Sequence, residues 1–335
     1  MMKWMWFITA ELQRISARLR LKIFSLNTTF AIVGWTVVLA LLLGCMEKGI
    51  PAETFFTFEN HQIWYHYNGE EDQTPLIILH GGPGMPSYYL ELLKELSDSI
   101  PIIIYDQLGA GRSDIPDNDE SYNVNYYVEE LEALTNHLGL KSIYLMGHSW
   151  GGYLATAYYD KYGRKVDKLI LASPLLDVNL WINDADSLKS LLPNAVKNTI
   201  DHYELLGDLD NDTYLAAVNV FYDKHFVRKS HRLVDSTFKY MGTRVYNYMW
   251  GNTEFNCSGT LKETSLLKSL TNIDIPVLLT GGEFDECPPT RLDFYASRME
   301  HSSVRVIKGA SHMSMVEKPE ENRRVIFEFL KRGDK

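Results

Sequence analysis

Short apolar runs recur along the chain from residue 74 onward, and segments with helical spacing lie between them. Runs of this length without strict alternation are typical of strands buried on both faces, as in parallel sheets. Residues 125–138 place apolar side chains at helical spacing with acidic residues between them, which predicts an amphipathic helix. The alternation predicts an α/β fold with a mostly parallel wound sheet. The expected strands are residues 55–58, 63–67, 74–79, 100–105, 142–146, 166–172, 275–280 and 303–307, the first two forming an opening hairpin.

The alternation of strands and helices stops between residues 177 and 267. No comparable apolar run occurs there, the segment reads as helical, and aromatic residues are scattered through it. The strand pattern then returns, which predicts that the helical segment is a lid inserted into the sheet domain. The expected organisation is a signal peptide or membrane anchor at 1–44, a first part of the core at 45–177, the lid at 178–267 and a second part of the core at 268–335.

Charge is distributed unevenly along the 335 residues. The formal net charge is -10, yet the residues before position 45 carry +4, which leaves about -14 for the rest. A body this acidic repels phosphate backbones, so nucleic acid is not expected as a partner.

The N-terminal segment reads as a targeting signal. Residues 30–44 are apolar apart from Thr36, a stretch that is short for a membrane span and suited to a signal-peptide core. The ending LLGC at 42–45 resembles the lipobox of bacterial lipoproteins, in which Cys45 would become the lipidated first residue of the mature protein. The alternative is a single-pass anchor that begins near Phe24, with the preceding basic residues in the cytoplasm. Both alternatives predict membrane attachment with the catalytic domain outside the cytoplasm.

The sequence GHSWGG at 147–152 follows one expected strand and precedes an expected helix at 153–162. A serine at a sharp turn from strand to helix needs small neighbours, because any Cβ there would collide with the adjoining backbone. The pattern is that of a nucleophile elbow and predicts Ser149 as the nucleophile.

Three further groups follow expected strands. The sequence HGGPG at 80–84 leaves backbone N–H groups unobstructed, as an oxyanion site requires, whereas His80 itself is expected to be structural. Asp285 lies just past the returning strand, and His312 lies in a small-residue turn after the last one. The order Ser149, Asp285, His312 resembles that of α/β hydrolases, in which the acid orients the histidine that serves as base.

The sequence offers little support for a nucleotide-binding site, a metal site or a disulfide framework. The glycine-rich loop at 106–114 lacks the ending of a P-loop and the glycine spacing of a dinucleotide fingerprint. No spacing of cysteine and histidine predicts a metal site, and no cofactor is expected. Besides Cys45, only Cys257 and Cys287 are present, too few for a disulfide framework. They are expected to be small, half-buried residues, and pairing between them stays open.

Several motifs together resemble the proline iminopeptidase family of serine aminopeptidases, from about residue 55 to the C-terminus. The lid segment is the most specific part of the resemblance, because the triad is shared by many chemistries whereas the pattern WGxxEF at 250–255 is particular to this group. The motifs are HGGPG at 80–84, DQLG at 106–109, GHSWGG at 147–152, MWGNTEF at 249–255, GTLK at 259–262 and GEFDE at 282–286.

The resemblance implies roles for individual residues. It makes Ser149, Asp285 and His312 the catalytic triad, and it places the oxyanion hole at the backbone N–H groups of Gly82 and Trp150. It also implies that Glu254 and Glu286 bind the free α-amino group of the substrate. Two carboxylates can accept charge-assisted hydrogen bonds from an ammonium group. A neutral internal amide cannot take the place of that ammonium group.

The expected activity is therefore release of N-terminal residues, proline among them, from short peptides with a free N-terminus through an acyl-enzyme. An esterase or small amide hydrolase would use the same triad without needing the carboxylate pair. A surface binding protein without catalytic activity is a second alternative.

Overall fold

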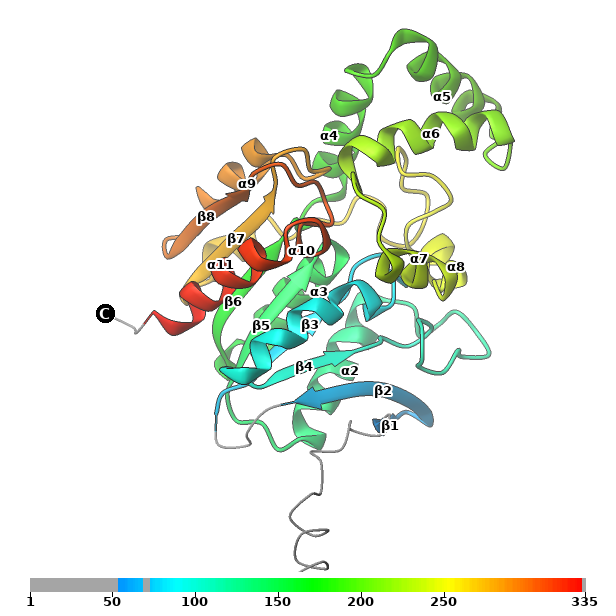
Figure 1. Cartoon of the computed structure of the whole chain (residues 1–335). Helices are drawn as coiled ribbons and strands as arrows, with labels where there is room; N and C mark the ends of the chain where they lie inside the picture. Colours follow the sequence, from blue (N-terminus) through cyan, green and yellow to red (C-terminus); the bar gives the residue numbers. More distant parts are fainter. Residues whose placement is uncertain (1–53, 69–72, 333–335) are drawn as a thin grey trace, which may run out of the picture. The chain divides into compact units, whose positions relative to one another are not determined.

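The computed structural model describes residues 54–68 and 73–332 (Figure 1). The predicted signal peptide or membrane anchor at 1–44 and the predicted lipidation site at Cys45 lie outside the described residues. Within the described ranges, none of the helices combines the length and the apolar character that crossing a bilayer demands.

One eight-stranded sheet organises the described chain, in the order β1-β2-β4-β3-β5-β6-β7-β8. Strands β1 and β2 form the predicted antiparallel hairpin, β2 also pairs antiparallel with β4, and the remaining strands are parallel to one another. The expected mostly parallel wound sheet is confirmed. The strands are β1 (Thr54–Phe58), β2 (His61–Asn68), β3 (Leu76–Leu79), β4 (Ile102–Tyr105), β5 (Ile143–His148), β6 (Val166–Ala172), β7 (Val277–Gly282) and β8 (Ser302–Ile307).

Helices cover both faces of the sheet, which explains why its central strands are apolar throughout. Ile77 and Leu79 of β3 pack into a core with α2 (Val124–His137), α3 (Trp150–Tyr162) and α9 (Pro289–Ala296). Leu76 and Ile78 of the same strand pack into a second core with η1 (Ser87–Asp98), α10 (Ser314–Glu317) and α11 (Pro319–Lys331). Successive side chains of a strand point to opposite faces, so one short run supplies both cores.

The 3₁₀ helix η1 was not predicted from the sequence. It begins after Pro86 without a side-chain cap, so the usual signal for a helix start is missing. Tyr89, Leu90, Leu93 and Leu96 are its buried apolar residues, and their helical spacing was the signal available.

Five helices lie between β6 and β7, in the segment expected to form the lid (Figure 1). They are α4 (Val178–Ser190), α5 (Asn194–Leu206), α6 (Asp212–His225), α7 (Arg232–Lys239) and α8 (Thr243–Met249). The side chain of Asp177 caps the first of these helices by accepting the N–H of Leu180 at 2.8 Å. Ile200, Tyr214 and Phe255 belong to a separate small core, so part of the aromatic content holds the lid together.

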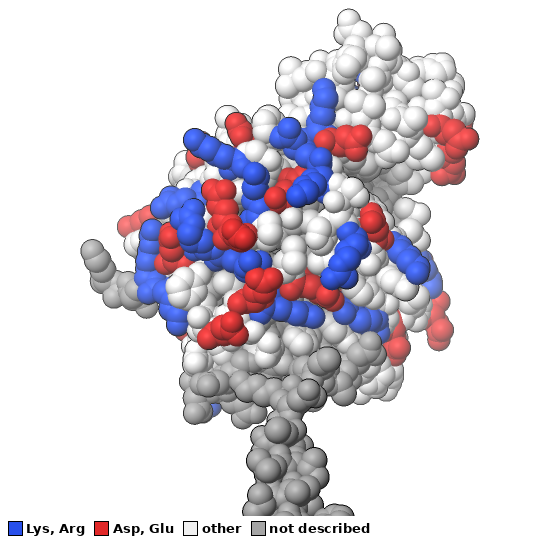
Figure 2. Space-filling model, in the orientation of Figure 1, with Lys and Arg blue, Asp and Glu red and all other residues white. Residues whose placement is uncertain are grey.

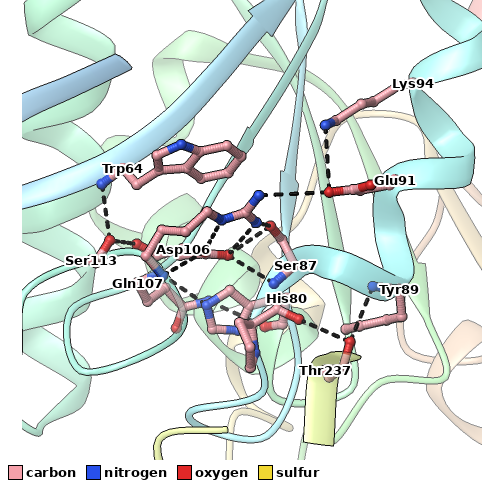
Figure 3. Close-up of polar contacts among 12 residues, drawn as sticks. Trp64, His80, Ser87, Tyr89, Glu91, Lys94, Asp106, Gln107, Ser113 and Thr237 are labelled. Carbon is pink, nitrogen blue, oxygen red and sulfur yellow. Dashed lines mark hydrogen bonds and ion pairs between the residues drawn. The ribbon is translucent and has the colours of Figure 1, made fainter. Parts of the chain in front are cut away.

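An ion pair within the loop after β4 is hydrogen-bonded through its buried carboxylate, Asp106, to the start of η1 (Figure 3). The carboxylate of Asp106 accepts the backbone N–H and the hydroxyl of Ser87 at 2.8 and 2.7 Å, and the Arg112 Nε–H at 2.7 Å. The Arg112 guanidinium stacks on Trp64 of β2, 3.3 Å from the ring centroid. Burial acts to raise the pKa of Asp106, but Arg112 outweighs it and the pKa lies below its usual value.

Charges also pair on the surface of the sheet domain, and Figure 2 shows Lys and Arg interspersed with Asp and Glu over its visible face. The pair of Lys161 with Glu129 is half exposed, whereas the Asp106 side chain is fully buried. Exposed pairs stabilise proteins little, and breaking a buried one leaves an uncompensated charge.

Replacing Asp106 with Asn should therefore lower the free energy of unfolding by about 3 to 5 kcal/mol. The matched change Glu129→Gln should lower it by no more than about 1 kcal/mol. Urea unfolding of both variants measures the difference. Similar small losses in the two would contradict a supporting role for the Asp106 ion pair.

Candidate active site

Ser149 lies at the turn between β5 and α3 with φ 55° and ψ -120°. A positive φ is strained for a residue with a side chain and persists only where the surroundings impose it. A Cβ on Gly147 would lie 2.0 Å from the Gly151 carbonyl oxygen, and one on Gly151 would lie 2.4 Å from the Leu79 carbonyl oxygen. The steric reason expected for small residues on both sides of the serine is therefore present.

His312 and Asp285 are joined at the same edge of the sheet. The His312 Nδ1 lies 2.8 Å from an Asp285 carboxylate oxygen, and both side chains are buried. Asp285 also accepts the Ser173 hydroxyl at 2.6 Å and the backbone N–H groups of Gly282 and Cys287 at 2.9 and 3.0 Å. Burial would raise the pKa of Asp285, but His312 and these donors outweigh it and lower the pKa. An ionised Asp285 holds the Nδ1–H tautomer and leaves Nε2 free to accept a proton.

Gly82 and Trp150, the predicted oxyanion residues, line the same cavity as Ser149. Gly82 has φ +108°, and a Cβ there would lie 2.6 Å from the backbone nitrogens of Gly84 and Met85. Trp150 is the first residue of α3, where backbone N–H groups have no intrahelical acceptor and the helix dipole favours negative charge. Both positions suit donors to a developing oxyanion.

His80 and Gln107 hold the glycine loop in place, and Figure 3 shows both residues below Asp106. His80 Nε2 accepts the Gln107 N–H at 2.9 Å, and the Trp150 indole N–H donates to the Gln107 side chain at 2.9 Å. The pKa of His80 is lowered chiefly by burial. The structural role expected for His80 agrees with these contacts.

Glu254 follows α8 and is contacted by three other lid residues. The Trp181 indole N–H donates to its Oε1 at 3.0 Å, and the hydroxyls of Tyr222 and Tyr246 donate to its Oε2 at 3.4 Å. Glu286 lies in the same cavity, and its buried Oε1 has no hydrogen-bond partner among the described residues. Buried carboxylate oxygens without partners are costly, so the cavity is suited to a ligand that donates hydrogen bonds.

The two carboxyl groups disfavour each other's charge. Burial raises the pKa of Glu254. The pKa of Glu286 is raised well above its usual value by burial, and further by the charges of Glu254 and Asp285. A bound ammonium group would act in the opposite direction and lower both pKa values, because a positive charge favours the ionised carboxylates.

Six of the seven predicted site residues line one cavity of about 170 Å³, and Asp285 lies behind His312. Much of the remaining wall is apolar, with Leu175, Phe226 and Met241 among its residues. The cavity thus combines a nucleophile, a base and two carboxyl groups with room for one small apolar group.

Comparisons with known proteins agree with this geometry. Residues 74–319 match the family described by the alpha/beta hydrolase fold. The chain is 38% identical over 261 residues to the proline iminopeptidase of Heyndrickxia coagulans, covering 77% of this chain and 90% of that protein. It is 35% identical over 284 residues to that of Lactobacillus helveticus (strain DPC 4571), covering 83% and 97%. The chain belongs to the proline iminopeptidase family.

A solved structure carries the same likeness. The crystal structure of the proline iminopeptidase of Mycobacterium smegmatis superposes with a TM-score of 0.78 at 30% identity, covering 83% of this chain and 97% of that one. The expected α/β-hydrolase fold is confirmed, and the proline iminopeptidase family is the one that the sequence motifs resembled.

In this member of the proline iminopeptidase family the lid contacts the loop of His312 through backbone hydrogen bonds. The N–H groups of His312 and Met313 donate to the carbonyls of His225 and Phe226, each at 3.0 Å. The His225 Nδ1–H donates at 2.9 Å to the carbonyl of Phe284, next to Asp285. The end of α6 therefore supports the loops of both the acid and the base.

Several residues around the site were missed from the sequence. Trp181, Tyr222 and Tyr246, which contact Glu254, are among the aromatic residues scattered through the lid segment, and nothing in their spacing separates them from core residues. Tyr89 lies in the unpredicted helix η1, and His148 fills the variable position before the serine.

The described residues contain no cluster of three or more His, Cys, Asp or Glu side chains arranged to hold a metal ion. Cys257 and Cys287 are free thiols, and at 1% and 0% exposure they are more deeply buried than expected. Burial raises the pKa of both thiols, which keeps them protonated.

The crowding at Ser149 predicts a large effect of a single methyl group. Gly147→Ala should lower the free energy of unfolding by about 3 kcal/mol or more, because its Cβ meets the backbone of Gly151 and Gly152 across the turn. Gly207→Ala is the control, since no atom lies within 4 Å of the Cβ added at Gly207, and the only penalty there is its positive φ, which Gly147 does not share. It should cost about 1 kcal/mol. Equal urea midpoints for the two variants would refute the steric argument.

Proposed function

We propose that the protein is a serine aminopeptidase that releases N-terminal residues, proline among them, from short peptides. The observation that carries the proposal is the pair of half-buried Glu254 and buried Glu286 in the cavity that Ser149 and His312 line. A hydrolase for neutral esters would gain nothing from two carboxyl groups in the cavity, because a neutral substrate leaves them without a counter-charge.

Ser149 attacks the first carbonyl of the peptide, and His312 takes the hydroxyl proton through Nε2. Asp285 holds the imidazole and stabilises its charged form through the 2.8 Å contact at Nδ1. The backbone N–H groups of Gly82 and Trp150 bind the oxyanion. His312 then protonates the departing amine, which leaves an aminoacyl ester on Ser149. Water activated by His312 hydrolyses this ester and regenerates the serine.

Glu254 and Glu286 select the substrate by binding its terminal ammonium group. The bound cation counteracts the raised pKa of Glu286, and it provides the Glu286 oxygen with a donor. An internal peptide bond has no ammonium group at this distance from the carbonyl, so it is excluded. The lid, residues 178–267, limits substrates to short or unfolded N-termini.

We further infer attachment to the membrane through the N-terminal segment, with the catalytic domain outside the cytoplasm. The support is the apolar stretch at 30–44 after a basic region, and the lipobox-like sequence that ends in Cys45. A single-pass anchor is the alternative form of attachment.

Free and N-acetylated proline p-nitroanilide separate peptidase from esterase-like selectivity. The free amine should be hydrolysed and the acetylated compound should not, because acetylation removes the positive charge that the carboxyl pair binds. Glu254→Gln and Glu286→Gln should each lower kcat/KM for the free amine by about 10- to 100-fold.

Glu283→Gln is the matched control, since Glu283 lies in the same loop but is exposed, and it should keep kcat/KM. Ser149→Ala gives the blank rate. Equal turnover of the two anilides by the wild-type protein would contradict the proposed recognition of the free amine.

Membrane attachment is tested by expressing the full chain in bacteria and separating membranes from soluble protein. The wild type should fractionate with membranes and, in the lipoprotein form, yield an N-terminal Cys45 that carries lipid in mass spectra. Cys45→Ser should prevent lipidation but would leave a helical anchor intact. Unmodified full-length protein in the soluble cytoplasmic fraction would contradict both forms.

A further inference from the structure

A buried chain of three hydrogen bonds connects the glycine loop to the backbone of His312. The Gly81 N–H lies 2.8 Å from the Tyr89 hydroxyl, and that hydroxyl lies 2.8 Å from Nδ1 of His148. Nε2 of His148 lies 3.1 Å from the His312 carbonyl oxygen. Tyr89 and His148 are fully buried, and neither has a role in the proposed reaction.

The donor and the acceptor in each of these three hydrogen bonds follow from the groups that each residue can offer. The His312 carbonyl can only accept, so Nε2 of His148 must carry a proton. In a neutral imidazole Nδ1 is then bare and accepts the Tyr89 O–H, whose oxygen accepts the Gly81 N–H. Burial, and then the charge of His312, lower the pKa of His148 to about 3, which keeps the ring neutral.

The two ends of this hydrogen-bond chain lie in parts of the site that are not held by a helix or a strand. Gly81 precedes Gly82, whose N–H is assigned to the oxyanion hole, and this loop has no regular secondary structure. His312 also lies outside helices and strands, between β8 and α10. Its N–H is held by the lid and its Nδ1 by Asp285, so the bond from His148 secures the remaining backbone group of the base.

Tyr89 is itself held firmly. Its backbone N–H donates to the Thr237 hydroxyl of α7 at 3.2 Å, and Figure 3 shows the two residues side by side. Its ring also packs edge-on against His148, with the ring centroids 5.2 Å apart. The hydroxyl is thus presented in one orientation.

We propose that Tyr89 and His148 are positioning residues that hold the oxyanion loop and the catalytic base at a fixed distance from each other. The proposal rests on the proposed function in taking Ser149, His312 and Gly82 as the reacting groups. The rings of His148 and His312 lie 4.6 Å apart, so the bridging residue must also stay uncharged when His312 takes up the serine proton. A neutral imidazole with one donor and one acceptor meets both requirements.

The test compares His148→Leu, which removes both hydrogen bonds, with His148→Gln, whose amide keeps one donor and one acceptor. His148→Leu and Tyr89→Phe should each lower kcat for proline p-nitroanilide about tenfold, and should leave KM within about twofold, because the ammonium site is not altered. His148→Gln should retain at least about a third of kcat.

Tyr158→Phe is the matched control for Tyr89→Phe. Tyr158 is equally buried and donates its hydroxyl to Glu132 at 2.8 Å, a bond that touches no site residue. It should change kcat by less than about twofold while lowering the melting temperature comparably to Tyr89→Phe. The rate of Ser149 labelling by a fluorophosphonate should follow kcat in all four variants, because this probe does not need the ammonium site.

Wild-type kcat and labelling rate in a folded Tyr89→Phe protein would overturn the proposal, as would equal losses in His148→Gln and His148→Leu. If Tyr89→Phe does not fold, the comparison of His148→Leu with His148→Gln tests the proposal by itself. A wild-type protein that reacts with the fluorophosphonate but does not cleave proline p-nitroanilide would refute the proposed function alone. The labelling rates of the variants would still test the positioning residues.

Discussion

The close approach of three backbone segments at Ser149 is the constraint on which the site depends. The elbow backbone at Gly147 and Gly151 packs against itself and against the end of β3 with no space for a Cβ on either glycine. This contact fixes the serine in a strained conformation and brings the glycine loop that follows β3 beside it. The proposed nucleophile and oxyanion donors are therefore positioned by one packing arrangement, before any side chain contributes.

A second constraint, the cost of burying charge, separates this site from a general hydrolase site. The pKa values of Glu254 and Glu286 are raised, whereas that of Asp285 is lowered because His312 and several donors surround it. The pKa values of three neighbouring carboxyl groups thus shift in different directions because their partners differ. In the proposed function, the substrate ammonium is the partner of Glu254 and Glu286.

The grouping of Ser149, Asp285 and His312, the proposed triad, could be predicted because each residue follows the carboxyl end of a strand, and in a parallel sheet these ends share one edge. The strand positions could be predicted from the apolar runs, because strands buried on both faces of the sheet are apolar throughout. The residues that surround these three side chains could not be predicted. Trp181 and Tyr246 contact Glu254 only through the lid's tertiary packing, and Tyr89 acts from a helix without a cap signal. Contacts between distant segments leave no periodic trace in the sequence.

The bonds between α6 and the loop of His312 have a consequence for how such a protein can change. Because the carbonyls of His225 and Phe226 hold the base, the segment that shapes the cavity also carries part of the catalytic apparatus. Residues facing the substrate can be replaced one at a time while this backbone contact persists. Exchanging the whole inserted segment for that of a relative would transfer a new selectivity only if the donor brought the same two carbonyls to the same place.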